Sequence, residues 1–270
     1  MRSFDYHRPS SLPEAARVYA AEADTRLLAG GMTLIPAMKM RLLLPPALVD
    51  LGGLAELRGI RAGKQEVGIG AMTRHAQVAG SADVRRLIPA LSALAAGIGD
   101  PQVRNRGTIG GAIANNDPAA DYPAALLGLG ATIATSKRRI PADKFFIGMF
   151  ETALEAGEII LQVTFPVPAM AVYEKFRSPA SRYALVGVFV ARTSSGVRVA
   201  VTGAAPCVFR ATALESLLSE KFAPEALAGF RFAAEGLNTD MHGDAQFRAN
   251  LISVLTRRAV ANLVAGGSKS

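Results

Sequence analysis

Two pairs of glycines constrain this 270-residue chain most, because each pair interrupts the pattern of its surroundings. Gly30-Gly31 follows a short apolar segment, and Gly110-Gly111 lies within residues 97–116, a stretch rich in glycine and asparagine. Glycine lets the backbone adopt positive φ and approach a ligand closely, so consecutive amides can point at a phosphate. Either pair alone is also a common turn. Together, the two pairs suit one pyrophosphate that is held from both sides.

The neighbours of the glycines refine this interpretation. Thr33 and Thr108 place hydroxyl groups where both could donate to the same anion. Neither loop fits GxGxxG or GxxxxGK[ST], so a Rossmann fold or a P-loop has no support. Residues 97–116 show little helix or strand periodicity, and an irregular stretch of that length inside a compact chain is normally functional.

The order of the expected elements indicates an α+β chain with two domains. Near the amino terminus, strands at 25–29 and 47–51 flank a helix that Thr33 can cap, which makes a β–loop–α–β unit. After Pro166 and Pro168 the pattern changes to three strands spaced like an antiparallel meander, at 171–177, 183–192 and 197–204. Helices are then expected at 210–219, 223–236 and 244–265. We therefore expect domains at 1–168, with subdomains at about 1–53 and 54–168, and at 169–270.

The composition excludes several classes of protein. Half of the residues are hydrophobic, only 19% are charged, and the mean hydropathy is +0.25, so the chain can bury a core and leave apolar surface for a partner. The longest uncharged run, 122–136, falls short of the roughly 18 residues of a membrane span. No secretory signal opens the chain, and the single Cys207 excludes an internal disulfide or a cluster held by this chain alone. We expect a cytoplasmic protein.

The net charge of +8 is compatible with nucleic acid, an anionic cofactor or an acidic partner. The basic residues are scattered, however, and the densest group is only Lys137-Arg138-Arg139, which we interpret as a solvated loop at a turn. Without interleaved aromatic residues or a recognition helix, nucleic-acid binding is not expected.

Few residues suit direct catalysis. His7, His75 and His242 lie far apart without the spacing of metal ligands, so each is interpreted as a structural or surface histidine. Asp117 and Asp121 are an acid/base couple, or else a turn former and a helix cap, and Asp121 could also accept from a ribose or ribityl hydroxyl. No nucleophile–base pair is present, so a cofactor has to supply any chemistry.

Long ordered motifs add a resemblance to a known family. The chain resembles the FAD-binding (medium) subunit of the molybdenum hydroxylases, the carbon monoxide dehydrogenase and xanthine dehydrogenase group, and especially its carbon monoxide dehydrogenase-like branch. The resemblance extends from about Phe4 to the last helices, and four segments carry it: AGGMTLIPAMKMRLLLP, IGAMTRHAQV, GDPQVRNRGTIGGAIANNDPAADYPAALLGLGATI and KFRSPASRYALVGVFVA.

The resemblance implies a fold and a site. The expected fold is an FAD-binding domain of two α/β subdomains, followed by a smaller α+β domain with a three-stranded antiparallel sheet and helices. Both glycine loops would hold the FAD pyrophosphate, through Ala29, Gly30, Gly31, Met32, Thr33, Thr108, Ile109, Gly110, Gly111 and Ala112. Asp121, Ile160, Lys175 and Ile98 would complete the flavin site. Met32 stands where the family often has His, and Ala112 where it often has Ser or Asn.

The resemblance also implies partners and a function. A small subunit would carry two 2Fe–2S clusters, and a large subunit would carry the molybdenum cofactor, in a dimer of heterotrimers. Electrons would pass from the clusters to FAD on this chain and then to an external acceptor, with no catalytic residue of its own. Two other classes stay open: a stand-alone FAD oxidoreductase, which needs a proton donor on this chain, and a nucleotide- or nucleic-acid-binding module without redox chemistry.

Overall fold

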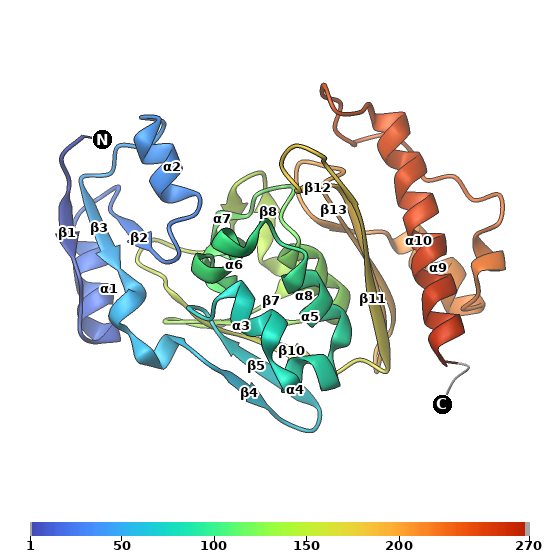
Figure 1. The fold of residues 1–270 in the computed structure, drawn as a ribbon, viewed down its shortest axis with the longest axis horizontal. Coiled ribbons are helices and arrows are strands. Elements are labelled where there is room, and N and C mark those ends of the chain that lie inside the picture. Colours follow the sequence, from blue (N-terminus) through green and yellow to red (C-terminus); the bar gives the residue numbers. More distant parts are fainter. Residues whose placement is uncertain (1, 268–270) are drawn as a thin grey trace.

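The computed structural model describes residues 2–267, which build three main sheets side by side along the long axis of the molecule (Figure 1). The amino-terminal sheet is parallel, with the order β1-β3-β2. Its strands and connecting helices are β1 (Asp5–His7), α1 (Leu12–Ala21), β2 (Arg26–Leu28), α2 (Leu34–Lys39) and β3 (Ala47–Asp50). Ser11 caps α1 by accepting from the Glu14 amide. The β–loop–α–β unit expected around Gly30-Gly31 is thus confirmed.

The central sheet has five strands in the order β4-β5-β10-β6-β7, and every neighbouring pair is antiparallel. Its strands are β4 (Ile60–Ala62), β5 (Glu66–Gly70), β6 (Thr132–Thr135), β7 (Arg139–Pro141) and β10 (Ile160–Pro166). A small hairpin of β8 (Phe146–Gly148) and β9 (Glu151–Thr152) lies beside it. The expectation of a second α/β subdomain is therefore wrong for this part, because its helices do not connect parallel strands.

Six helices follow β5 in the chain before β6 returns to the central sheet: α3 (His75–Gly80), α4 (Ala82–Leu87), α5 (Pro89–Ala96), α6 (Pro101–Arg106), α7 (Ile109–Asn115) and α8 (Tyr122–Leu129). Two of them replace the irregular stretch expected at 97–116. Asp100 starts α6 by accepting from the Val103 amide at 2.8 Å, and Thr108 starts α7 by accepting from the Gly111 amide at 3.1 Å. These local caps form helices where the glycine content suggested none.

The carboxyl-terminal sheet is antiparallel and has four strands, so the expected three strands are joined by a short fourth. Its strands are β11 (Met170–Arg177), β12 (Ala184–Thr193), β13 (Gly196–Thr202) and β14 (Phe209–Arg210), and α9 (Thr212–Glu220) and α10 (Ala245–Gly267) cover its outer face. The helix expected at 223–236 is wrong. Only the short turn Pro224–Leu227 is helical there, and Gly229 and Gly236 take positive φ.

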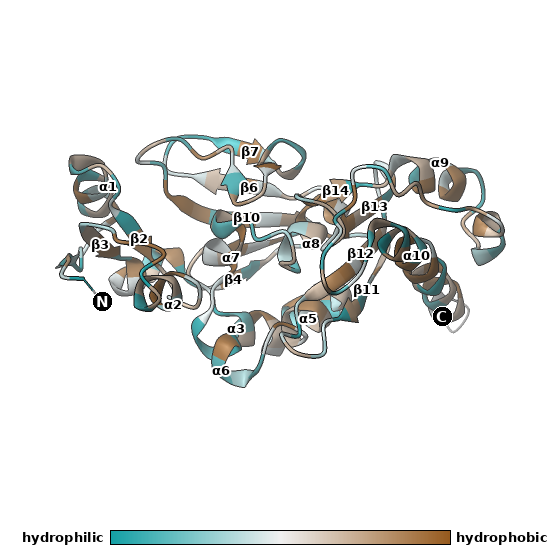
Figure 2. Cartoon of the chain, turned by 90° about the horizontal axis from the view of Figure 1, so that it is seen from above, coloured by the Kyte–Doolittle hydropathy of each residue, from teal (hydrophilic) through white to brown (hydrophobic). Residues whose placement is uncertain are grey.

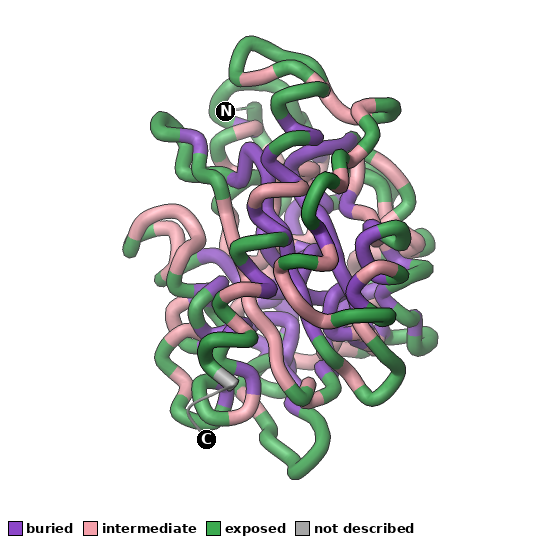
Figure 3. The backbone as a smooth tube through the Cα atoms, turned by 90° about the vertical axis from the view of Figure 1, so that its right-hand side faces the viewer, coloured by how far each residue is buried: buried purple, intermediate pink, exposed green. Residues whose placement is uncertain are grey.

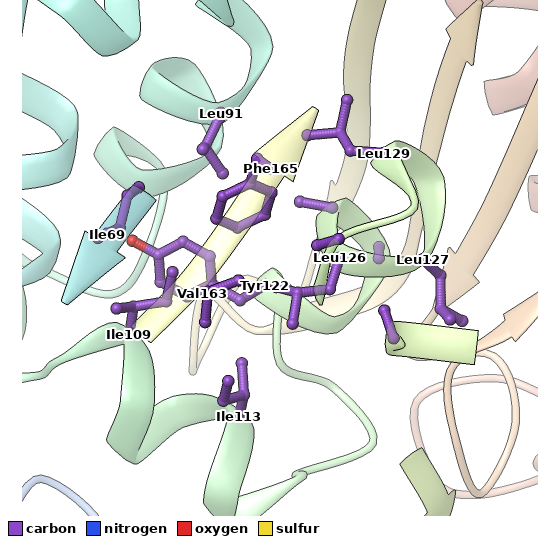
Figure 4. Packing of buried hydrophobic residues seen from close by; sticks show 14 of the residues in the cluster. Ile69, Leu91, Ile109, Ile113, Tyr122, Leu126, Leu127, Leu129, Val163 and Phe165 are labelled. Atoms are coloured by element: carbon purple, nitrogen blue, oxygen red, sulfur yellow. The ribbon is translucent and has the colours of Figure 1, made fainter. Parts of the chain in front are cut away.

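Helix α8 packs against both the central and the carboxyl-terminal sheets, and all eight of its residues are buried. It lies between β10 on one side and β12 and β13 on the other (Figure 2). Tyr122 and Leu126 pack with Val163 and Phe165 of β10 in one continuous apolar cluster (Figure 4). Figure 3 shows buried residues concentrated in the middle of the molecule, with exposed residues mainly in the loops around them.

This packing predicts that any side chain at Gly128 of α8 destabilises the folded protein. A Cβ there would lie 2.5 Å from Cδ1 of Phe189 on β12. We expect Gly128→Ala to lower the free energy of unfolding by about 1–3 kcal/mol, as overpacking does, in urea titrations. Gly80→Ala is the matched control, since nothing lies within 4 Å of its Cβ position. Equal effects of the two substitutions would contradict the packing argument.

Candidate functional site

A cleft of about 1240 Å³ opens between the amino-terminal sheet and the helices of the central sheet. Both glycine loops line it, and so do most of the other expected site residues: Ala29, Gly30, Gly31, Met32, Thr33, Ile98, Thr108, Gly110, Gly111, Ala112, Asp121 and Ile160. Two expected residues do not line the cleft. Ile109 is fully buried in the apolar core, and Lys175 reaches the site only through Asp121. The fold therefore brings distant segments of the chain to one cavity.

The first glycine loop follows β2 and offers free backbone donors. Within residues 2–267, the amides of Gly30, Gly31 and Met32 donate to no protein acceptor. Gly31 has φ +73°, a conformation that favours glycine. Thr33 occupies the N-cap position of α2 but makes no side-chain cap bond, because its backbone is already helical. The expected cap is therefore wrong, while the row of amides suits an anion.

The second glycine loop differs, because the amides of Ile109, Gly110 and Gly111 donate to acceptors within the chain. The Ile109 amide donates to the Thr73 carbonyl, the Gly110 amide to the Ala71 carbonyl, and the Gly111 amide to Thr108 Oγ1. These three consecutive amides therefore have acceptors within the chain, and a contact of this loop with a phosphate stays a prediction. Since Thr108 Oγ1 accepts from Gly111, its hydroxyl proton stays available as a donor.

The two loops pack against each other through their glycines. A Cβ on Gly30 would clash with the carbonyl oxygen of Arg106 and lie 2.8 Å from Cα of Gly107. A Cβ on Gly111 would lie 3.0 Å from Thr108 Oγ1 and 3.4 Å from Cβ of Ala29. Gly30 thus allows the close approach of the two loops, which gives the cleft a floor of exposed backbone.

Asp121 lies at the start of α8, but its carboxylate does not cap the helix. Tyr173 Oη donates to Oδ1 at 2.5 Å, and Lys175 Nζ donates to Oδ2 at 2.9 Å, both from β11. Burial raises the pKa of Asp121, although Lys175 opposes this effect. The interpretation of Asp121 as a side-chain cap is therefore wrong. Asp117 does form the expected turn, since its Oδ1 accepts from the Ala119 amide at 2.9 Å.

Two polar side chains of the cleft wall were not expected at the site, although His75 was interpreted as a structural or surface histidine. His75 and Tyr122 are buried with ring centroids 5.3 Å apart, and within the described chain His75 Nδ1 and Tyr122 Oη have no hydrogen-bond partner. Burial, with a smaller contribution from Arg104, lowers the pKa of His75 from 6.5 to about 4. The imidazole is therefore neutral at physiological pH. His7 and His242 are exposed, as expected.

The rim of the cleft carries exposed apolar side chains from separate loops. Met32, Phe150 and Tyr183 line the cleft and are 41%, 58% and 46% exposed. Only Met32 belonged to the expected site, and no pattern in a single sequence points to the other two. Among residues 2–267, no group of three or more His, Cys, Asp and Glu side chains could hold a metal ion. None of the helices in that range combines the length and apolar character of a bilayer span.

Comparison with known proteins agrees with this geometry. Residues 2–168 match the family described as the FAD binding domain in molybdopterin dehydrogenase. The chain is 36% identical to the carbon monoxide dehydrogenase medium chain of Hydrogenophaga pseudoflava, over 95% of this chain and 96% of the relative. It is 34% identical to the nicotine 6-hydroxylase medium subunit of Paenarthrobacter nicotinovorans, over 94% and 95%.

A solved structure agrees as well. A chain in the reconstituted CO dehydrogenase from Oligotropha carboxidovorans superposes with a TM-score of 0.91 and 34% identity, over 98% of each chain. The resemblance stated from the sequence motifs is therefore confirmed.

The buried ion pair of Asp121 and Lys175 predicts that substitutions of the two residues have non-additive effects on stability. Lys175→Met leaves the Asp121 carboxylate unpaired in the interior, so we expect the free energy of unfolding to fall by about 3–5 kcal/mol. Adding Asp121→Asn should recover part of that loss, because no unpaired charge then remains. Urea unfolding of the two single variants and the double variant forms the cycle. Additive effects would show that the two groups do not interact.

The neutral His75 predicts a pH dependence. Because the pKa of His75 is lower in the folded chain, about 4, than the ordinary value of 6.5, the unfolded chain binds the proton first as the pH falls. The free energy of unfolding therefore decreases as the pH falls from about 6.5 to about 4. From about pH 7.5 to about pH 5, the free energy of unfolding should fall by about 2 kcal/mol more in the wild type than in His75→Gln. Urea titrations at both pH values measure this difference. Parallel pH profiles would show that His75 titrates normally.

Proposed function

The chain belongs to the FAD-binding family of the molybdopterin dehydrogenases, and from this premise we propose that it is the electron-transfer subunit of a heteromeric molybdenum hydroxylase. In the proposed route, electrons leave 2Fe–2S clusters on a partner subunit, pass through FAD on this chain and reach an external acceptor. The row of free amides in the first glycine loop, at the floor of the cleft, is the observation that carries the proposal.

The residues of the cleft fit FAD. In our proposal the amides of Gly30, Gly31 and Met32 hold the pyrophosphate, and the second loop supplies Thr108 and a surface that Gly111 keeps flat. Ile98 and Ile160 provide apolar walls, and Asp121 is held in place by Lys175. FAD supplies one- and two-electron chemistry when bound. This chain binds it, orients it and shields it from water.

Partners carry the remaining chemistry in this proposal. With one cysteine in the chain, a 2Fe–2S cluster needs another polypeptide for its ligands. We propose a small iron–sulfur subunit, a large subunit with the molybdenum cofactor and a dimer of heterotrimers, located in the cytoplasm. The named relatives act on carbon monoxide and on nicotine. We infer that the large subunit decides which substrate is oxidised.

A division into an FAD-binding domain, 1–168, and a second domain, 169–270, is part of the same proposal. Two observations support a boundary there. The last strand of the central sheet, β10, ends at Pro166, and the first strand of the carboxyl-terminal sheet, β11, begins at Met170.

The proposal predicts that Gly30→Ala abolishes FAD retention, because the new Cβ would push the second loop away from the first. The measurement is the visible flavin absorption of the full chain after incubation with FAD and gel filtration. A colourless wild type is retested as the complex isolated from its native host. Gly80→Ala serves as the control, with circular dichroism to confirm folding. Normal flavin content in Gly30→Ala would show that the pyrophosphate lies elsewhere.

A further inference from the structure

One wall of the cleft is a connecting segment rather than a helix or a sheet face. Between β9 and β10, the chain contributes Leu154, Glu155, Ala156, Glu158 and Ile159 to the lining. Residues in such a segment keep their positions only if other parts of the molecule hold them.

The far end of this segment reaches the amino-terminal sheet. Gly157 has φ +71°, and a Cβ on it would lie 3.6 Å from Cβ of Ala20 in α1. Ile159 is fully buried with Val49 and Leu51 in the core of the amino-terminal unit. The segment therefore contacts the amino-terminal part of the molecule before the chain enters β10 of the central sheet.

Arg138, at the turn between β6 and β7, contacts this segment at several points. Its Nη2 donates to the Ala153 carbonyl at 2.6 Å, and Nε and Nη2 donate to the two oxygens of Glu158 at 3.1 and 3.2 Å. Its guanidinium also lies 3.2 Å from Glu155. One planar side chain thus joins both ends of the segment, a geometry that the guanidinium fork suits.

Glu158 is the buried acceptor of this network. Its carboxylate also accepts from Thr135 Oγ1 at 2.6 Å and from the Glu155 amide at 2.8 Å. Burial raises the pKa of Glu158, but the hydrogen bonds from Arg138, Thr135 and the Glu155 amide outweigh burial and lower it to about 2. The carboxylate is therefore charged at neutral pH.

Lys137 adds a contact at the middle of the segment. Its Nζ donates to the Ala156 carbonyl at 2.9 Å. The basic group is exposed at a turn, as interpreted from the sequence, but Lys137 and Arg138 also hold the neighbouring segment through hydrogen bonds. Arg139 differs: no hydrogen bond or ion pair of its side chain to another part of the described chain is found.

We propose that Arg138 and Glu158 are positioning residues for FAD: the Arg138–Glu158 pair holds segment 153–159 in the shape that forms one wall of the cofactor cleft. The inference rests on the FAD site proposed above. Glu158 lines the cleft, but both oxygens of its carboxylate already accept hydrogen bonds within the chain. The pair acts through the backbone of residues 153–156 and through the buried position of Ile159.

The test compares two neighbouring arginines of equal charge. Arg138→Ala removes the contacts to Ala153 and Glu158, and Arg139→Ala is the matched control. We expect the FAD dissociation constant, measured by flavin fluorescence on the full chain or its native complex, to rise about tenfold or more in Arg138→Ala and less than about twofold in Arg139→Ala. Arg138→Lys keeps the charge but not the fork, so an intermediate constant is expected.

A second readout separates positioning from general stability. Hydrogen exchange of the amides at 153–159, measured without FAD, should accelerate in Arg138→Ala, while exchange in α8 stays at the wild-type rate. Should Arg138→Ala fail to fold, Arg138→Lys carries the same comparison. An FAD constant in the Arg138 variants equal to that of Arg139→Ala, even with faster exchange, overturns the proposal and leaves the FAD site intact. A wild-type native complex that holds no FAD would instead overturn the proposed function.

Discussion

The burial of α8 between two sheets is the constraint on which the rest of this molecule depends. All eight residues of the helix are buried, and the cluster that includes Tyr122 and Leu126 extends to Phe189 of the carboxyl-terminal sheet. At the start of the helix, Asp121 is fixed by Tyr173 and Lys175 of β11. Because Asp121 also lines the cleft, the carboxyl-terminal sheet sets the position of a cleft residue. The apolar cluster around α8 therefore crosses the chain boundary near Pro168, although the carboxyl-terminal part also has a cluster of its own.

The two glycine loops show why similar sequences can have unlike roles. The first leaves its amides free, whereas the second uses them to join α7 to Ala71 and Thr73. Gly30 then matters for its lack of a side chain, since the second loop passes directly against it. An anion site formed in this way combines donors from one loop with steric room from the other. In the proposed site, neither loop alone supplies both the donors and the steric room.

The sequence predicted the elements that have strong local signals and missed what depends on distant contacts. Strands β2 and β3, the helix α8 and the long α10 have apolar patterns that a reader can follow residue by residue. Residues 97–116 were expected to be irregular because of their glycines, but Asp100 and Thr108 cap two short helices there. The expected helix at 223–236 failed at Gly229 and Gly236, whose positive φ ends helical backbone. Nothing local pairs Arg138 with Glu158 or places Lys175 on Asp121, since 20 and 54 residues separate them.

Three separate interactions thus hold the walls of the cleft. Glycine contact brings the two loops together, the Asp121–Lys175 pair ties α8 to β11, and the Arg138–Glu158 pair fixes the segment that crosses between the parts. Two of these interactions are ion pairs in which the carboxylate is buried and accepts hydrogen bonds on both oxygens. Such groups add little net stability, but they disfavour any arrangement that would leave the carboxylate unpaired. At the proposed FAD site, the two ion pairs therefore favour one arrangement of the cleft walls over others.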